Sequence, residues 1–382
     1  MKVFKIISVL LSVMFVLSSC GGATIDNSDT TEQEVTETMP PKEYITKTLA
    51  MQEVESLIKP LGRAYILDAA LTADHAAAGF EVYLDCKGDV SLDITTAKNV
   101  KFSVTVDGVT KKNVLVPAGS SALTVATGLE EGLHSVKIIN ETGFVSGSKV
   151  DIKSITFTGE IAEVDIDRSG AYIEFIGDSI SAGYGLSATE GDSHDTTLAY
   201  PYLTAELLGT DYTILARSGL GVAYSAGASN IFENTYPYAS ETRGKAPYAP
   251  TRVPDLVVVN LHTNDNYQWY SKGGNVDGDY YNMATFDTKF DGMIKTITAT
   301  CGDNVAMLFV FGCMASPNWT LATDRSIELI DGKYTDEGYD VAHVTLPTDR
   351  NGAEAHPSAA GAEKQAQALV EYIKEFYPEL CS

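Results

Sequence analysis

The hydrophobic pattern of this 382-residue chain changes its period near residue 160, and this change limits the folds that the chain can adopt. Before it, apolar and polar side chains alternate, as in the runs 80–86 and 102–106, and Asp107-Gly108 supplies a hairpin turn. Segment 91–95 is a further, separate strand candidate. A period of two is typical of strands with one buried face. Such strands, with turn signals between them, predict an antiparallel sandwich of the jelly-roll kind, which we place at residues 46–162.

A different pattern begins at about residue 168. Continuous apolar runs, which are typical of strands buried on both faces, alternate here with helical stripes of apolar residues. The runs cover residues 172–176, 212–216, 256–261, 305–311 and, more weakly, 341–344, and the stripes lie in 286–297 and 366–376. This alternation predicts a mostly parallel sheet between two layers of helices, so we expect a three-layer α/β/α domain over residues 168–382.

Length and charge narrow the class of protein. A chain of 382 residues is long enough for two domains, and 44% hydrophobic residues describe a globular protein rather than a disordered one. The formal net charge of −24 disfavours nucleic acid or an anionic membrane surface as a partner. A solvated acidic surface is the ordinary explanation, and it is also compatible with a neutral polysaccharide as partner.

The first twenty residues predict export. Two lysines precede an apolar run over residues 6–17 that is too short to span a membrane comfortably, which is the pattern of a secretory signal. Small residues lead from this run to Cys20 and resemble a bacterial lipobox, which implies a signal peptide over residues 1–20 and a lipid on Cys20. We therefore expect an exported bacterial lipoprotein on the periplasmic or cell-surface face, anchored through its lipid only, with residues 21–45 as a flexible acidic tether. The alternative is an ordinary signal peptide in which Cys20 has no role.

The remaining cysteines and the histidines give no metal signal. Cys86, Cys301, Cys313 and Cys381 include no C-x-x-C pair, so neither a zinc site nor a thioredoxin-type redox pair is indicated. One or two disulfides, for example Cys301 with Cys313, and buried free thiols are both open. Four histidines are not grouped at metal-ligand spacing, so we expect no metal and no cofactor; they are His75, His134, His194 and His343.

Residues that carry chemistry gather at the ends of the predicted parallel strands. Gly177-Asp178-Ser179 follows the first apolar run, and segment 216–221, with two glycines, follows the second. His262-Thr263-Asn264-Asp265 follows the third, and Glu354-Ala355-His356-Pro357 precedes the last helical stripe. Because the carboxyl ends of parallel strands lie at one edge of a sheet, we expect these four segments to converge.

The converging residues suit nucleophilic catalysis. A serine hydroxyl attacks a carbonyl when a neutral imidazole takes its proton, and Ser179 and His356 are the candidates for these roles. A carboxylate on the second ring nitrogen fixes the tautomer, and Glu354 is close enough in sequence to supply it. A strand-end serine alone is usually a helix cap, and His356-Pro357 is open to the same interpretation.

The oxyanion of a tetrahedral intermediate needs two or three hydrogen-bond donors. The candidates are the backbone N–H of Ser179, the N–H of Gly221 or Gly219, and the side-chain amide of Asn264, since glycine lets the backbone approach a substrate closely. An Asx turn is the alternative role for Asn264. The aspartates that precede Ser179 and follow Asn264 are expected to organise the loops.

Taken in this order, the four segments resemble the SGNH (GDSL-type) hydrolase superfamily, and a β-sandwich before such a domain is similar to carbohydrate esterase family 2, the acetyl xylan esterase-like group. The resemblance covers the chain from about residue 60 and includes Gly62-Arg63. It implies a flavodoxin-like α/β domain in which Ser179 is the nucleophile, His356 is the base, and Asn264 with a loop glycine completes the oxyanion hole.

Two positions depart from the pattern of this superfamily. His262 stands where the superfamily has a glycine, and its imidazole is expected either to touch substrate or to pack beside the pocket. The acidic residue is displaced as well, because position 353 is alanine and Glu354 lies only two residues before His356. Some family 2 esterases, by the same resemblance, work as a Ser–His dyad with a backbone carbonyl on the imidazole, so Glu354 stays open as third member.

These features predict a serine esterase that removes O-acetyl groups from polysaccharides of the xylan or mannan type through an acyl-enzyme. Trp269 and Trp319, with the tyrosines around 267–281, are candidates for an aromatic platform under a sugar, and plain packing is the alternative. The rival functions are a non-catalytic glycan-binding lipoprotein on the same scaffold and an esterase or lipase that acts on another ester. The sequence leaves the oligomeric state open.

Overall fold

The computed structural model describes residues 43–381 apart from 145–148, 165–169, 188–193, 226–230, 241–245, 251 and 272–281. Glu43–Ser382 form one compact unit. The predicted signal peptide, Cys20 and nearly all of the tether lie outside the described residues. Within the part that is described, no helix is both long enough and apolar enough to cross a membrane.

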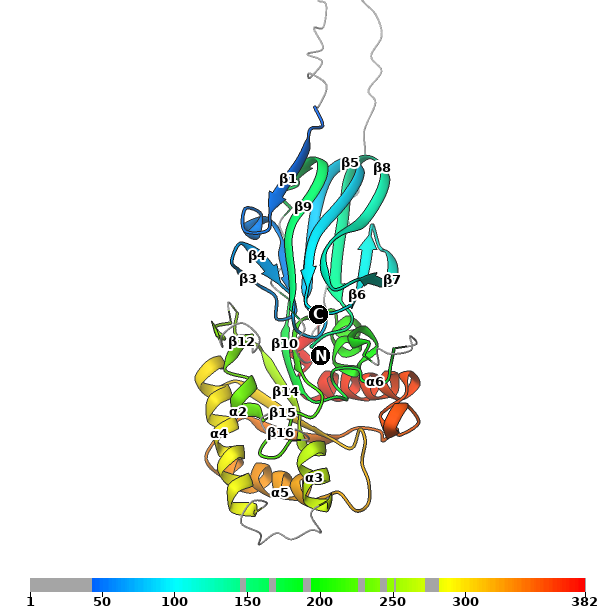
Figure 1. Ribbon diagram of the computed structural model, residues 1–382. Helices are drawn as coiled ribbons and strands as arrows, with labels where there is room; N and C mark the ends of the chain where they lie inside the picture. The colour runs from blue at the N-terminus through cyan, green and yellow to red at the C-terminus, as the bar shows by residue number, and fades with distance from the viewer. Residues whose placement is uncertain are drawn as a thin grey trace, which may run out of the picture. The chain divides into compact units, whose positions relative to one another are not determined.

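The first half of the described chain folds into a curled antiparallel sheet (Figure 1). Its strands lie in the order β3-β4-β9-β5-β8-β6-β7, while β1 pairs with β9 and β2 pairs with β5. The strands are β1 (Thr46–Ala50), β2 (Lys59–Leu61), β3 (Tyr65–Leu67), β4 (Ala70–Thr72), β5 (Gly79–Thr96), β6 (Val100–Val106), β7 (Val109–Val116), β8 (Gly119–Asn140) and β9 (Val150–Ile161). The antiparallel β structure predicted from the period of two is confirmed.

The long strand β5 explains how this sheet curls. It joins two runs that the sequence suggested as separate strands, 80–86 and 91–95, and its register with β8 shifts on both sides of Gly88. Buried side chains nevertheless stay on the same face before and after the shift. Because such irregularities bend a strand without turning its side chains over, the sheet wraps around one apolar core.

The second half contains the predicted parallel sheet, and its strands lie in the order β11-β10-β14-β15-β16. The strands are β10 (Tyr172–Gly177), β11 (Asp211–Ala216), β14 (Leu256–Asn260), β15 (Ala306–Phe311) and β16 (Val341–Thr345). Every residue of β10, β14 and β15 is buried, which accounts for their continuous apolar runs. A separate two-stranded hairpin, β12 (Tyr238–Ser240) with β13 (Ala246–Pro247), follows the short helix α2 (Phe232–Thr235).

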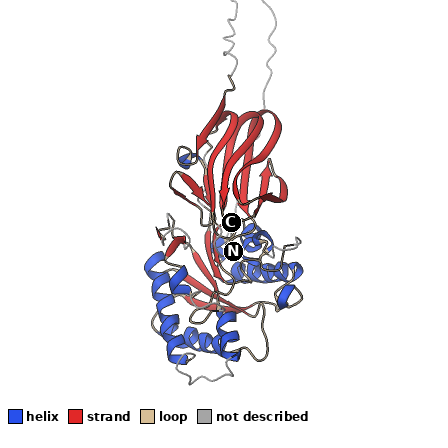
Figure 2. Cartoon of the chain, in the orientation of Figure 1, coloured by secondary structure: helices blue, strands red, loops and turns tan. Residues whose placement is uncertain are grey.

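Helices cover both faces of the parallel sheet (Figure 2). Helices α1 (Tyr200–Leu208) and α6 (Ala359–Phe376) share one core with it, and α3 (His262–Ser271), α4 (Met283–Cys301) and α5 (Leu321–Leu329) share the other. The first residues of α4 and α6 are capped by Asn282 and Ser358. Ser358, rather than His356, therefore caps α6.

Candidate active site

Strand β10 ends in a sharp turn that places Ser179 at the carboxyl edge of the parallel sheet. Gly177 is its last residue, and a Cβ there would lie 2.0 Å from Oγ of Ser181, so only glycine fits. The buried carboxylate of Asp178 accepts the backbone N–H of Ile180 at 2.9 Å and holds the turn. Burial raises the pKa of Asp178 to about 7. Asp178 thus acts on the backbone, as expected of it.

The loop after β16 brings His356 to Ser179. Nε2 of His356 lies 2.8 Å from Oγ of Ser179, and Nδ1 lies 3.2 Å from the carbonyl oxygen of Ala353. A proton on Nδ1 that is donated to this carbonyl leaves the lone pair of Nε2 directed at the serine hydroxyl. Burial lowers the pKa of His356 below its ordinary value, against the opposing effect of its backbone hydrogen bonds, so the ring is neutral near pH 7.

Glu354 lies beside this pair, not within it. Its side chain is exposed. The hydrogen-bond partner of Nδ1 is the carbonyl of Ala353, whereas the sequence suggested the carboxylate of Glu354 for this position. Glu354 and Ala355 both have left-handed backbone conformations, with φ of 48° and 61°, in a tight turn that directs this carbonyl to the imidazole. The charge of Glu354 still raises the pKa of His356. A triad role for Glu354 therefore stays a prediction.

Asn264, in the first turn of α3, links the serine turn to the glycine loop. Its Nδ2 atom donates to the carbonyl of Leu220 at 2.9 Å and to Oδ2 of Asp178 at 3.2 Å. Both amide N–H groups thus have protein acceptors. To hold an oxyanion, Asn264 has to share one of these N–H groups with the substrate or release it.

The carboxylate of Asp265 fixes the glycine loop that follows β11. It accepts the backbone N–H groups of Val222, Ala223 and Tyr224 at distances between 2.7 and 2.9 Å. The predicted loop-organising role of Asp265 is confirmed. Within the loop, Gly219 has a φ of +83°, and a Cβ on the buried Gly221 would lie 1.9 Å from the carbonyl oxygen of Tyr224. Each glycine thus meets a backbone requirement, and which of them offers an N–H to the oxyanion stays a prediction.

Three further residues lie near the Ser–His pair and were not assigned to the site from the sequence: Tyr184, His194 and Ser218. The ring of Tyr184 lies 4.6 Å from that of His356 and 5.3 Å from that of His194, between centroids. Nε2 of His194 lies 2.9 Å from Oγ of Ser218, the residue before Gly219. Tyr184 stands between two glycines, five residues after Ser179, and this is the pattern in the sequence that could have pointed to it.

His262 packs in the interior. It is 3% exposed, its ring centroid lies 4.6 Å from that of Phe311, and neither ring nitrogen has a hydrogen-bond partner among the described residues. Burial lowers its pKa to about 3. Of the two interpretations left open for His262, the structure supports packing beside a cavity of about 150 Å³.

The two tryptophans have different surroundings. Trp269 is fully buried against Tyr224, so its candidacy for a sugar platform is wrong. Trp319 is half-buried and lies between the exposed rings of Tyr267 and Tyr270, at centroid distances of 5.4 and 5.8 Å. Tyr280 and Tyr281 lie outside the described residues.

The four cysteines that the structure describes are free. Cys86, Cys301 and Cys313 are buried thiols and Cys381 is half-buried, so the Cys301–Cys313 disulfide is not formed. Among the residues that the structure describes, no group of three or more His, Cys, Asp or Glu side chains is placed to hold a metal ion.

A family model and curated relatives match this chain. The model for GDSL-like lipase/acylhydrolase matches residues 173–369, slightly more than half of the chain. A cellulase/esterase, CelE, of Acetivibrio thermocellus is 26% identical over 319 residues, which cover 78% of this chain and 37% of that protein. An acetylxylan esterase/glucomannan deacetylase of Cellvibrio japonicus is 23% identical over 269 residues, which cover 65% of this chain and 71% of that protein. The chain thus spans little more than a third of the first relative.

A solved structure shares the fold. A family two carbohydrate esterase from Clostridium thermocellum, solved in complex with cellohexaose, matches with a TM-score of 0.72 at 24% identity. The match covers 84% of this chain and 99% of that chain, so it includes both the curled sheet and the parallel sheet.

Proposed function

Because the chain belongs to the GDSL-like lipase/acylhydrolase family, we propose that it is a serine esterase that removes O-acetyl groups from polysaccharides of the xylan or mannan type. The observation that carries this proposal is the 2.8 Å contact between Nε2 of His356 and Oγ of Ser179 at the carboxyl edge of the parallel sheet. A serine at that distance from a neutral imidazole is an activated nucleophile.

The reaction proceeds in two steps through an acyl-enzyme. Ser179 Oγ attacks the acetyl carbonyl as His356 takes its proton, and the oxyanion is held by the N–H of Ser179, the N–H of Gly221 or Gly219, and the amide of Asn264. His356 then gives the proton to the departing sugar oxygen, so the C–O bond breaks and the acetyl group stays on the serine. Water, deprotonated by the same imidazole, releases acetate and restores Ser179.

The substrate class rests on the relatives and on one surface feature. One relative is named an acetylxylan esterase and glucomannan deacetylase, and the solved structure holds cellohexaose. The aromatic cluster consists of the half-buried Trp319 and the exposed Tyr267 and Tyr270 of α3, and such rings stack on the apolar faces of sugars. Arg350, six residues before His356, lies 5.3 Å from the Trp319 ring and connects the cluster with the loop of the base.

The location of the protein and the fold of the curled sheet are two further parts of the proposed function. We propose that the chain is exported and attached to a membrane through a lipid on Cys20, on the motif described above. We also propose that the curled sheet is a jelly roll, since the long strands β5 and β8 pair along most of their lengths and the whole sheet encloses one core. Retention in the membrane fraction, lost in Cys20→Ala, tests the anchor.

Acetate release tests the activity. Acetylated xylan, acetylated glucomannan and 4-nitrophenyl acetate are incubated with the wild type, with Ser179→Ala and with Ser271→Ala, an exposed serine at the end of α3 that serves as matched control. We expect release by the wild type and the control, none above background by Ser179→Ala, and labelling of Ser179 by a serine-reactive phosphonate. A Ser179→Ala variant as fast as the wild type contradicts the proposal. Binding of the glycans without acetate release supports the non-catalytic rival, and release of longer acyl chains only supports another ester.

A further inference from the structure

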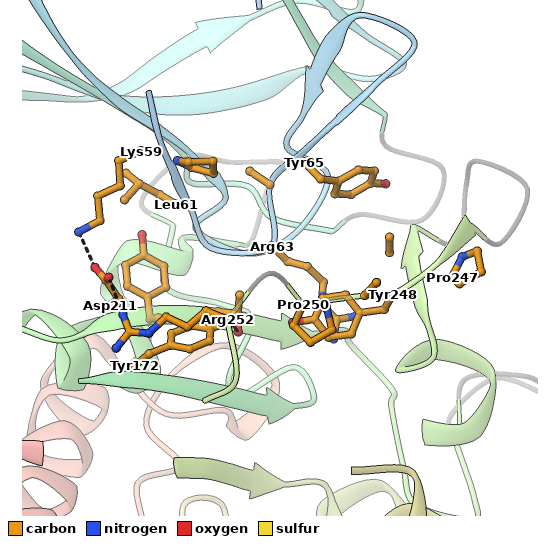
Figure 3. A pocket seen from close by; sticks show the side chains of 16 residues that line it. Lys59, Leu61, Arg63, Tyr65, Tyr172, Asp211, Pro247, Tyr248, Pro250 and Arg252 are labelled. Atoms are coloured by element: carbon orange, nitrogen blue, oxygen red, sulfur yellow. Dashed lines mark hydrogen bonds and ion pairs between the residues drawn. The ribbon is translucent and has the colours of Figure 1, made fainter. Parts of the chain in front are cut away.

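A second cavity lies at the edge of the parallel sheet where β10 and β11 begin, which is opposite the edge that carries Ser179. Figure 3 shows this cavity from close by. Its volume is about 290 Å³, and it is lined by residues from β2 and β3 on one side and by the first residues of β10 and β11 on the other. Tyr172, in its lining, begins β10, whose other end leads into Ser179. The length of that strand separates the cavity from the serine by roughly 20 Å. We call this cavity the inter-sheet pocket.

Tyrosine rings form much of its lining. These are Tyr65, Tyr172, Tyr212 and Tyr248. Figure 3 shows Tyr65 on the side of the curled sheet and Tyr172 and Tyr248 across the pocket from it. A tyrosine ring offers an apolar face together with a polar hydroxyl edge. The hydroxyls of Tyr172, Tyr212 and Tyr248 already bond to Thr213, Ala77 and Glu174, so these rings offer a ligand mainly apolar surface.

Each charged group of the lining has a partner of opposite charge, within the lining or just outside it. Nζ of Lys59 lies 2.5 Å from one carboxylate oxygen of Asp211, and Arg252 contacts the other oxygen at 3.1 Å (Figure 3). Arg63 contacts the buried carboxylate of Glu174 at 3.2 Å, and its guanidinium lies 3.5 Å from the centre of the Tyr248 ring. Each of these charges already has a partner of opposite sign, so the lining does not need an ionic ligand to neutralise it.

A neutral hydroxylated ligand suits this paired lining. The side chains of Lys59, Asp211 and Arg252 keep between 18% and 31% of their surface exposed, so sugar hydroxyls can bond to them while the ion pairs persist. The volume of about 290 Å³ lies just below the usual range of small-molecule sites, ~300–1,000 Å³, and ligand sites are frequent where two structural units meet. Size and lining together favour one or two sugar rings.

We propose that the inter-sheet pocket binds a short neutral stretch of a polysaccharide chain, at a distance from the active site; the identity of this ligand rests on the proposed function. Because the pocket and Ser179 lie at opposite edges of the sheet, a chain held in the pocket leaves the serine free. A second attachment point raises the effective concentration of acetylated residues near Ser179. The curled sheet, which supplies Lys59 and Tyr65, thereby takes part in capturing the substrate.

Calorimetric titration with xylohexaose and mannohexaose tests the pocket. We expect Tyr65→Ala to weaken binding of at least one of them tenfold or more, and Tyr65→Phe, which keeps the ring, to bind like the wild type. Lys59→Met, at the rim, is a second test should Tyr65→Ala fold poorly, and we expect weaker binding from it as well. Tyr83→Ala removes another half-buried tyrosine, in β5 and outside the pocket, and is the matched control with unchanged affinity.

Hydrolysis of 4-nitrophenyl acetate separates this proposal from the proposed function, because that ester carries no sugar. A wild type that hydrolyses the ester but binds neither oligosaccharide, or that binds them equally well after Tyr65→Ala and Lys59→Met, overturns the pocket and leaves the esterase intact. Loss of all binding in Trp319→Ala, with full binding in Tyr65→Ala, places the sugar at the aromatic cluster and overturns it too. Binding that depends on Tyr65, without hydrolysis of any acetate ester, overturns the proposed function and not the pocket.

Discussion

At the scale of single residues, a base that is oriented by a backbone carbonyl depends little on a neighbouring carboxylate. The carbonyl of Ala353 lies 3.2 Å from Nδ1 of His356, while the Glu354 side chain is exposed. We expect Glu354→Ala to lower kcat for 4-nitrophenyl acetate only a few-fold, whereas His356→Ala lowers it by on the order of 10³ or more. Equal losses in the two variants show instead that the carboxylate is indispensable. Steady-state kinetics on purified proteins provide the comparison.

The acid limb of the pH profile follows from the surroundings of the same imidazole. His356 has to be neutral to accept the serine proton, so kcat/KM falls as the pH drops through its pKa. Burial lowers that pKa below the ordinary value of 6.5, and the half-maximal point is therefore expected below pH 6.5. The charge of Glu354 raises the pKa of His356, so Glu354→Gln should move the midpoint to still lower pH. A midpoint above 6.5 in the wild type contradicts the assignment.

The sequence located the two side chains that are proposed to react and left their surroundings undetermined. Ser179 and His356 stand at strand ends in an order that places them at one sheet edge, and the structure brings them to 2.8 Å. The partner of Nδ1 is a backbone carbonyl, which every residue carries, so no side-chain pattern marks it. The burial of Trp269 and His262 could not be predicted from the sequence either. Both residues belong to α3, which begins directly after β14, and their side chains lie on the face of this helix that packs into the core.

At the scale of elements, the glycine loop after β11 depends on a residue of α3. The Asp265 carboxylate accepts three backbone N–H groups of that loop. Asp265→Ala leaves all three without this acceptor, and we expect a loss of about 2–5 kcal/mol of unfolding free energy. A fall in kcat accompanies it, because the loop glycines border the site. Urea unfolding measures the first effect, and Asp303→Ala, at an exposed position after α4, is the control that should leave both unchanged.

Elements with a strong pattern were predicted well, and the exceptions have a physical cause. The buried parallel strands and the apolar stripes of α4 and α6 are visible because burial on both faces, or on one helical face, demands apolar residues. Strand β5 was divided in two because Lys87-Gly88-Asp89 interrupts the alternation like a turn. The chain instead bends there within one strand. The continuous strand is determined by pairing with β8 and β9 on both sides of the bend and not by the local sequence.

At the scale of the whole molecule, one buried ion pair joins the segment between β2 and β3 to strand β10, which carries Ser179 at its end. Arg63 and Glu174 are each 1% exposed in their side chains and 3.2 Å apart. Arg63 also donates to the carbonyls of Tyr236 and Tyr238, and the hydroxyl of Tyr236 donates to Glu174 at 2.7 Å. The preceding Gly62 has a φ of +60°, and a Cβ there would lie 2.9 Å from the Ala77 carbonyl oxygen, so this position favours glycine.

Removing one member of this pair should lower the free energy of unfolding by more than the attraction between the two charges contributes, because the other charge is left buried and uncompensated. We expect Arg63→Met to lower the unfolding free energy by about 3–5 kcal/mol. Arg325→Met is the matched control: it breaks a half-exposed pair with Asp287, and such pairs contribute at most about 1 kcal/mol. Adding Glu174→Gln to Arg63→Met removes the stranded charge and should restore part of the stability. Urea unfolding followed by circular dichroism gives all three values. Equal stability of the two single variants would mean that water reaches Glu174 once Arg63 is gone, and that the ion pair does not hold the curled sheet to the strand of the serine.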